Sequence, residues 1–153
     1  MGNASKARLI ALLLPLALLG GALGSQYLGG LHPCEMCYWQ RWPHGGAIVL
    51  AAFSFVTRNG TSRMLTLLAA IAIAISGAIG VYHAGVEAHV FQGLTTCTAN
   101  GARTLNEILN APLVRCDQVQ FSFLGISMAG WNAILSLGGA ALISILLLRE
   151  RGE

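Results

Sequence analysis

Charged side chains are scarce in this sequence. Only 10% of its 153 residues are Asp, Glu, Lys or Arg, whereas 55% are hydrophobic and the mean hydropathy is +0.65. A soluble domain of this size carries about 25% charged residues. The composition therefore indicates a membrane protein. The basic residues also form no continuous stripe, so nothing in their pattern supports nucleic-acid binding.

The four cysteines lack the companions that a metal or haem site needs. Cys34 and Cys37 form a CxxC pair, but 18 residues separate Cys97 from Cys116, so there is no second pair. The histidines show no ligand spacing either: His32, His44, His83 and His89. A c-type haem needs CxxCH, and here tyrosine follows the pair. We expect no metal site, and an inert structural disulfide and a redox pair stay open as alternatives.

Four long apolar stretches predict four membrane-spanning helices. About 20 helical residues cross a hydrocarbon core of about 30 Å. The expected spans cover residues of about 9–31, 37–57, 64–86 and 128–148. The first is longer than the apolar region of a signal peptide, so we expect it to be retained. The chain is thus predicted to be a single all-α membrane domain, residues 1–153, built as a four-transmembrane-helix bundle.

The second expected span indicates where the CxxC pair lies. The apolar run between Arg41 and Arg58 is too short to cross a membrane, so a spanning helix has to begin near Cys37. The helix dipole then favours a thiolate at Cys37, and Arg41 adds a cation on the same face. These features favour a redox pair. Because the chain lacks the βαβ pattern of thioredoxin, a dithiol at the lipid boundary suggests a lipid-soluble electron acceptor.

Basic residues are distributed unequally between the expected loops. Six lie on the side of the N-terminus, namely Lys6, Arg8, Arg58, Arg63, Arg149 and Arg151. Three lie on the other side, namely Arg41, Arg103 and Arg115. The positive-inside rule therefore places both termini in the cytoplasm. The outer loops, about residues 32–36 and 87–127, and the outer end of the second span then place all four cysteines on the oxidising side of a bacterial inner membrane, where disulfides persist.

The long outer loop is expected to hold a second disulfide between Cys97 and Cys116. This bond would either staple the loop or exchange with the CxxC pair. Between the two cysteines, Thr104 to Glu107 has the form of a capping box ahead of an apolar pair. That pattern predicts a short helix lying on the membrane surface. Loops of this length are usually functional.

The motifs resemble those of the disulfide bond formation protein B (DsbB) family of membrane thiol:quinone oxidoreductases. The matching segments are CEMCYWQR at 34–41, VYHAGVE at 81–87, the second cysteine pair, and FLGISMAGWN at 123–132. The resemblance covers nearly the whole chain. It implies a four-helix bundle in membrane lipid that reoxidises a DsbA-like periplasmic thioredoxin-fold protein, passes the electrons to ubiquinone or menaquinone, and so supports disulfide bond formation.

The resemblance implies a catalytic role for each cysteine. The partner's thiolate would attack Cys97 and release Cys116. Cys116 would then exchange with the Cys34–Cys37 bond at Cys34. Cys37 would engage the quinone as a thiolate.

The resemblance also implies a quinone site that includes Cys37, Arg41 and His83. Arg41 would stabilise negative charge on the quinone. His83 would lie close to the quinone, and its alternative role is a packing histidine bonded to a neighbouring helix. Gln40 departs from the family, which often has an acidic residue before the arginine. The role of Glu87 is left open.

Two rival functions are less well matched. An oxidoreductase of the vitamin K epoxide reductase type also combines CxxC, a loop cysteine pair and a quinone. The QR that follows CxxC and the FLGISMAGWN segment argue against it. A non-enzymatic tetraspan scaffold or small channel would need polar residues through its spans, and apart from His83 the third and fourth spans carry little but Ser and Thr.

Overall fold

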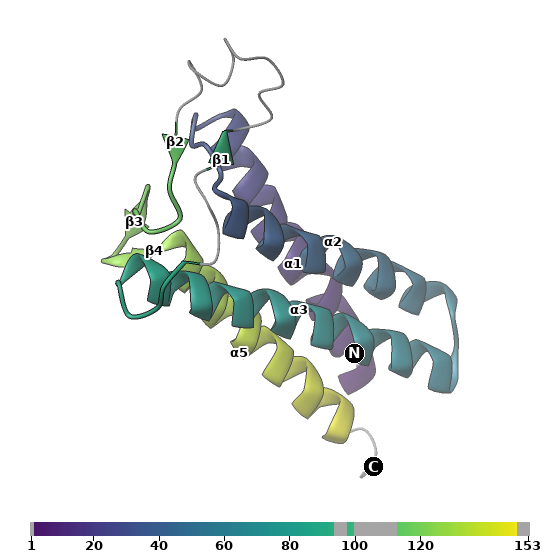
Figure 1. Ribbon diagram of the computed structural model, residues 1–153. Helices are drawn as coiled ribbons and strands as arrows, with labels where there is room; N and C mark the ends of the chain where they lie inside the picture. The colour runs from purple at the N-terminus through teal and green to yellow at the C-terminus, as the bar shows by residue number, and fades with distance from the viewer. Residues whose placement is uncertain (1, 94–97, 100–112, 150–153) are drawn as a thin grey trace.

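The computed structural model describes residues 2–93, 98–99 and 113–149 (Figure 1). These residues form four helices: α1 (Asn3–Tyr27), α2 (Glu35–Val56), α3 (Asn59–Glu87) and α5 (Met128–Arg149). Two short antiparallel ladders accompany them, one pairing β1 (Thr98–Ala99) with β2 (Leu113–Val114), the other pairing β3 (Ser122–Phe123) with β4 (Ile126–Ser127). The predicted surface helix over residues 104–109 lies outside the described part of the chain.

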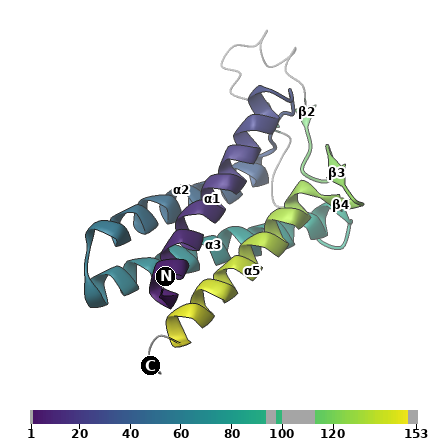
Figure 2. The same ribbon diagram turned by 180° about the vertical axis from the view of Figure 1, so that it is seen from behind.

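The helices pack as a bundle with distinct ends. Helix α3 packs along both α2 and α5, and α1 packs against α2 and α5. The starts of α1 and α3 and the end of α5 lie at one end of the bundle, and the four strands lie at the other (Figures 1 and 2). The segment that joins α1 to α2 therefore lies at the same end as the strands that precede α5.

Three helices, α1, α3 and α5, are long and apolar enough to cross a membrane. Helix α2 does not meet the same measure of length and hydropathy. Its first half carries Gln40, Arg41 and His44 among its apolar residues, which lowers its hydropathy. The all-helical architecture and three of the four expected spans therefore agree with the sequence, and the fourth span stays a prediction.

Helix α1 ends earlier than the expected first span. It stops at Tyr27, whereas the apolar run continues to Leu31. Gly30 has a φ of +67°, a left-handed conformation that glycine adopts without strain. A Cβ on Gly29 would lie 2.6 Å from Ser25 O, so this close turn requires glycine as well. Two glycines thus end the helix inside an apolar stretch, where hydropathy alone predicts continuation.

Small side chains let the helices approach closely. The core cluster between the four helices consists mainly of alanine: Ala7, Ala11, Ala47, Ala51, Ala69, Ala70, Ile73, Ala140, Ile143 and Leu147. Gly80 on α3 shows the same effect, because a Cβ there would lie 3.0 Å from Ala129 O on α5. Close backbone contact of this kind is typical of membrane bundles, where van der Waals packing holds helices together.

Replacing Gly80 by valine is expected to destabilise the fold by about 1–3 kcal/mol, because the added atoms would push α3 away from α5. Thermal unfolding in detergent, followed by tryptophan fluorescence, measures the change. Gly20→Val on α1 is the matched control, since a Cβ there meets nothing within 4 Å. Equal unfolding midpoints for the two variants would contradict this account of the α3–α5 contact.

Candidate functional site

The CxxC pair lies at the start of α2. Cys34 is the N-cap residue, and its Sγ accepts a hydrogen bond from the backbone N–H of Cys37 at 3.4 Å. The two Sγ atoms are 3.0 Å apart. Because one helical turn joins the two residues, both thiols lie at the N-terminal end of the helix dipole, which favours thiolate chemistry there.

Tertiary packing brings Cys116 and His83 to this pair. The Sγ atoms of Cys34 and Cys116 and a ring nitrogen of His83 lie within 4.8 Å of one another, and all three residues are buried. His83 Nε2 is 3.5 Å from Cys34 Sγ. Sulfur and imidazole are the donors that zinc accepts, but a structural zinc site needs four ligands. The arrangement favours thiol exchange, with Cys34 next to two other sulfurs.

The environments of Cys34 and Cys37 differ. Cys34 is 2% exposed, while Cys37 is half-buried and faces a cavity. Interactions with the Cys116 and Cys37 thiols, together with burial, hold the pKa of Cys34 well above its ordinary value. Reduced Cys34 is therefore kept as a thiol, whereas Cys37 has the helix N-terminus available to stabilise its negative charge.

Cys97 lies outside the described residues. Strand β1, which follows it in the sequence, pairs with β2 so that Thr98 faces Val114. Val114 stands two residues before Cys116 in the chain. The strand that follows Cys97 and the strand that precedes Cys116 are thus paired in one ladder.

Arg41 supplies a fixed positive charge beside Cys37. Its guanidinium donates to Gln26 Oε1 and to Ala22 O on α1, and it lies 5.1 Å from the centre of the Tyr38 ring. Its Nε is buried and makes no hydrogen bond within the described residues. No carboxylate of the described chain forms an ion pair with it. The charge is therefore held in place by neutral groups and is free to act on another molecule.

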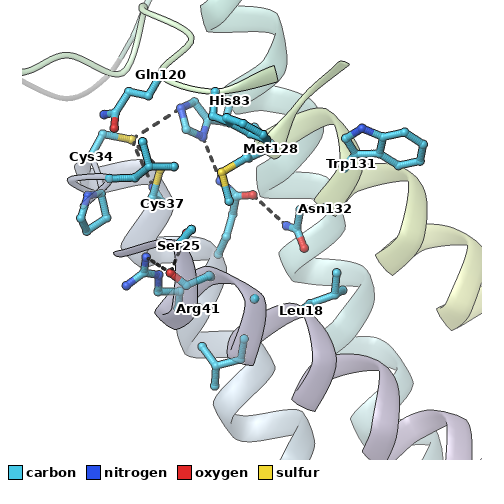
Figure 3. Close-up of a pocket in the computed structure, with 18 of the residues that line it drawn as sticks. Leu18, Ser25, Cys34, Cys37, Arg41, His83, Gln120, Met128, Trp131 and Asn132 are labelled. Atoms are coloured by element: carbon cyan, nitrogen blue, oxygen red, sulfur yellow. Dashed lines mark hydrogen bonds between the residues drawn. The ribbon is translucent and has the colours of Figure 1, made fainter. Parts of the chain in front are cut away.

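A cavity of about 310 Å³ opens next to these groups, bounded by all four helices and the strand segment (Figure 3). Its lining is mostly apolar, and the residues labelled in Figure 3 belong to it: Leu18, Ser25, Cys34, Cys37, Arg41, His83, Gln120, Met128, Trp131 and Asn132. The volume lies within the range of small-molecule sites, which combine apolar walls with a few polar groups. Sequence reasoning missed Met128, Trp131 and Asn132, although all three stand in FLGISMAGWN.

A buried polar network lies beside the cysteines and joins three helices. Gln40 Nε2 on α2 is 2.9 Å from His83 Nδ1 on α3, and Asn132 Nδ2 on α5 donates to Gln40 Oε1 at 2.7 Å. His83 thus bonds a neighbouring helix, which is one of the two roles considered from sequence, and it also faces Cys34. Its place beside a quinone stays a prediction. Polar groups within a membrane bundle need such partners. Gln40 and Asn132 were not predicted as site residues, because only the fold brings them together.

Glu87 lies one turn beyond His83 on α3. Its Oε1 is 3.8 Å from His83 Nε2, and its Oε2 is buried and makes no hydrogen bond within the described residues. Glu87 also lines the cavity. The carboxyl group therefore lies beside His83 and the cysteines. The sequence had left the role of Glu87 open.

Comparison with known proteins agrees with these features. The model of the family described as disulfide bond formation protein DsbB matches residues 4–146. Disulfide bond formation protein B of Burkholderia pseudomallei is 30% identical over 151 residues, covering 90% of this chain and 86% of the relative. Disulfide bond formation protein B 1 of Pseudomonas fluorescens is 28% identical over 153 residues, covering 89% and 85%.

The corresponding protein B of a Polaromonas species is 26% identical over 143 residues, covering 86% of this chain and 83% of the relative. No solved structure matches the chain. The family match extends over the helices, the CxxC pair, the cavity and the loop cysteine alike. The chain belongs to the disulfide bond formation protein DsbB family, membrane oxidoreductases of disulfide bond formation.

Proposed function

We propose that this protein is a quinone-dependent disulfide oxidase that reoxidises a DsbA-like periplasmic thioredoxin-fold protein. One observation carries the proposal. Cys34 Sγ lies 3.0 Å from Cys37 Sγ and within 4.8 Å of Cys116 Sγ, so one sulfur borders both cysteine pairs. Disulfide exchange proceeds by attack of a thiolate on a neighbouring sulfur, and this position makes Cys34 the point of transfer.

The exchange steps move two electrons without any free intermediate. The partner's thiolate attacks Cys97, the Cys97–Cys116 bond breaks, and its electron pair goes to Cys116. Cys116 then attacks Cys34, the Cys34–Cys37 bond breaks, and its electron pair goes to Cys37. The partner's second thiolate then attacks the mixed disulfide, the bond to Cys97 breaks with its electron pair going to Cys97, and the partner leaves as a disulfide. The β1–β2 ladder beside Cys97 and Cys116 supports their pairing.

The cavity residues fit a bound quinone. The apolar walls, with Leu18, Met128 and Trp131, suit a flat hydrophobic ring. Arg41 lines the cavity, and its guanidinium charge, which no carboxylate of the described residues neutralises, would stabilise negative charge on a ring oxygen. The quinone, as ubiquinone or menaquinone, supplies a two-electron acceptor. Cys37 presents its sulfur to the cavity, and His83 borders the same space.

The proposed location is a bacterial inner membrane, with both termini in the cytoplasm and all four cysteines facing the periplasm. The start of α1 and the end of α5 lie at the same end of the bundle, which supports this topology (Figure 1). The Cys34–Cys116 site lies at the opposite end, where a periplasmic partner has access. In this arrangement α2 is the fourth span, and it begins at Glu35, before its own residues that line the cavity, which are Cys37, Gln40, Arg41 and His44.

Replacing Cys37 by alanine is expected to reduce quinone reduction to background, because the electron pair can no longer reach the cavity. The assay mixes purified protein with a reduced thioredoxin-fold partner and a soluble quinone, and follows quinone absorbance and partner thiols. Ser144→Ala on α5 is the control, because its hydroxyl donates to Ala140 O and lines no part of the cavity. The proposal fails if the wild-type protein reduces no quinone, or if Cys37→Ala does so at the wild-type rate.

Replacing Cys116 by alanine is expected to trap a mixed disulfide between Cys97 and the partner. Cys97 would then have no neighbouring thiol to resolve the bond. A non-reducing gel detects the species, and mass spectrometry of its peptides identifies the linked cysteine. A linkage through Cys34 would contradict the assignment of roles.

A further inference from the structure

Two backbone carbonyls fix the orientation of a buried pair of amides. Asn132 Nδ2 lies 3.2 Å from Ser76 O, and Gln40 Nε2 lies 3.2 Å from Met36 O. A carbonyl oxygen can only accept, so each amide has to turn its nitrogen towards that oxygen. Asn132 Nδ2 then donates its other hydrogen to Gln40 Oε1. A flip of either side chain would bring two acceptors or two donors face to face.

The remaining atoms of Asn132 are also held. Its Oδ1 accepts from His44 Nε2 at 2.9 Å and from Ser136 Oγ at 3.0 Å, which uses both lone pairs. The hydroxyl of Ser76 donates to Gln40 O at 2.8 Å. Every hydrogen-bonding atom of the two amides therefore has a partner. Buried groups satisfied in this way resist rotation, because any other orientation leaves a polar atom unpaired.

The fixed amides determine where His83 carries its proton. Gln40 Nε2 lies 2.9 Å from His83 Nδ1. An amide nitrogen is only a donor, so His83 Nδ1 accepts and carries no proton. The proton of the neutral ring is then on Nε2, which lies 3.5 Å from Cys34 Sγ. Glu87 Oε1 lies 3.8 Å from the same nitrogen, which is beyond hydrogen-bond distance for an oxygen acceptor. Figure 3 shows the ring with one dashed line to Cys34 and another on its opposite side.

We propose that Gln40 and Asn132 are positioning residues, which hold His83 in the Nε2–H form so that it donates a hydrogen bond to the sulfur of Cys34. The inference rests on the proposed function, because Cys34 becomes a leaving group only in the relay. When Cys97 attacks Cys116, the Cys97–Cys116 bond re-forms, the Cys34–Cys116 bond breaks, and its electron pair goes to Cys34 Sγ. Hydrogen bonds to a charged sulfur are stronger than those to a neutral one. The Nε2–H group therefore stabilises the departing thiolate.

A carboxylate at either amide position reverses this arrangement. With Gln40→Glu, both side-chain oxygens accept only, so His83 has to donate from Nδ1. With Asn132→Asp, Gln40 Oε1 loses its donor and meets a carboxylate oxygen. This charged oxygen repels it more strongly than the neutral Met36 carbonyl does, so the Gln40 amide turns and its oxygen faces His83 Nδ1. Two substitutions on different helices are thus expected to cause the same shift of one proton.

The proton position is measured by ¹⁵N NMR of the histidine rings in the full-length protein in lipid nanodiscs, with the His83 signal assigned by its loss in His83→Gln. We expect a protonated Nε2 and a bare Nδ1 in the wild-type protein, and a protonated Nδ1 in Gln40→Glu and Asn132→Asp. Gln92→Glu makes the same chemical change at an exposed residue and should leave the spectrum unchanged. A wild-type His83 with its proton on Nδ1 overturns the proposal, whether or not the variants fold.

The kinetic consequence is measured with protein freed of quinone and mixed with excess reduced partner. Oxidation of the first equivalent of partner needs only the opening of the Cys97–Cys116 bond, whereas the second equivalent requires Cys34 to leave. We expect Gln40→Glu and Asn132→Asp to slow the second equivalent by about tenfold or more and to leave the first unchanged. Equal slowing of both equivalents, or no slowing despite the shifted proton, overturns the proposal. Failure of the wild-type protein to reduce quinone would overturn the proposed function instead, since neither measurement here uses quinone.

Discussion

The cap that Cys34 forms on α2 is the contact on which the rest of the site depends. Its Sγ accepts from the Cys37 N–H, so the helix starts where the two sulfurs meet. The same start directs Arg41, one turn further on, to the wall of the cavity. If α2 began elsewhere, Cys37 would lose the helix dipole and Arg41 would lose its place beside it. A single hydrogen bond from the Cys37 backbone N–H to the Cys34 sulfur thereby fixes both the start of the helix and the position of the redox pair.

The helices pack differently at the two ends of the bundle. Towards the chain termini, a core made mainly of alanine lets the helices approach closely. Around the cysteines, the helices instead exchange hydrogen bonds through Gln40, His83 and Asn132. Such a network is costly to bury unless every atom is paired, so it specifies one arrangement of α2, α3 and α5. That fixed arrangement is what a relay between sulfur atoms requires.

Much of this architecture could be predicted from local sequence, because the apolar runs and the CxxC spacing each determine features of a single helix. The start of α2 at Glu35 lies two residues before the expected one, whereas the two glycines after Tyr27 end α1 inside an apolar run. Contacts between distant segments could not be predicted in the same way. The meeting of Cys116 with Cys34, and the bond between Gln40 and Asn132, arise from tertiary packing that no spacing rule describes.

The central claim is that Cys34 joins two disulfides into one relay. The most direct measurement counts how many equivalents of reduced partner the fully oxidised protein converts to disulfide when no quinone is present. The account predicts two equivalents for the wild-type protein, one for each disulfide, and a single equivalent for Cys34→Ala. Two equivalents from Cys34→Ala, or only one from the wild-type protein, would contradict it.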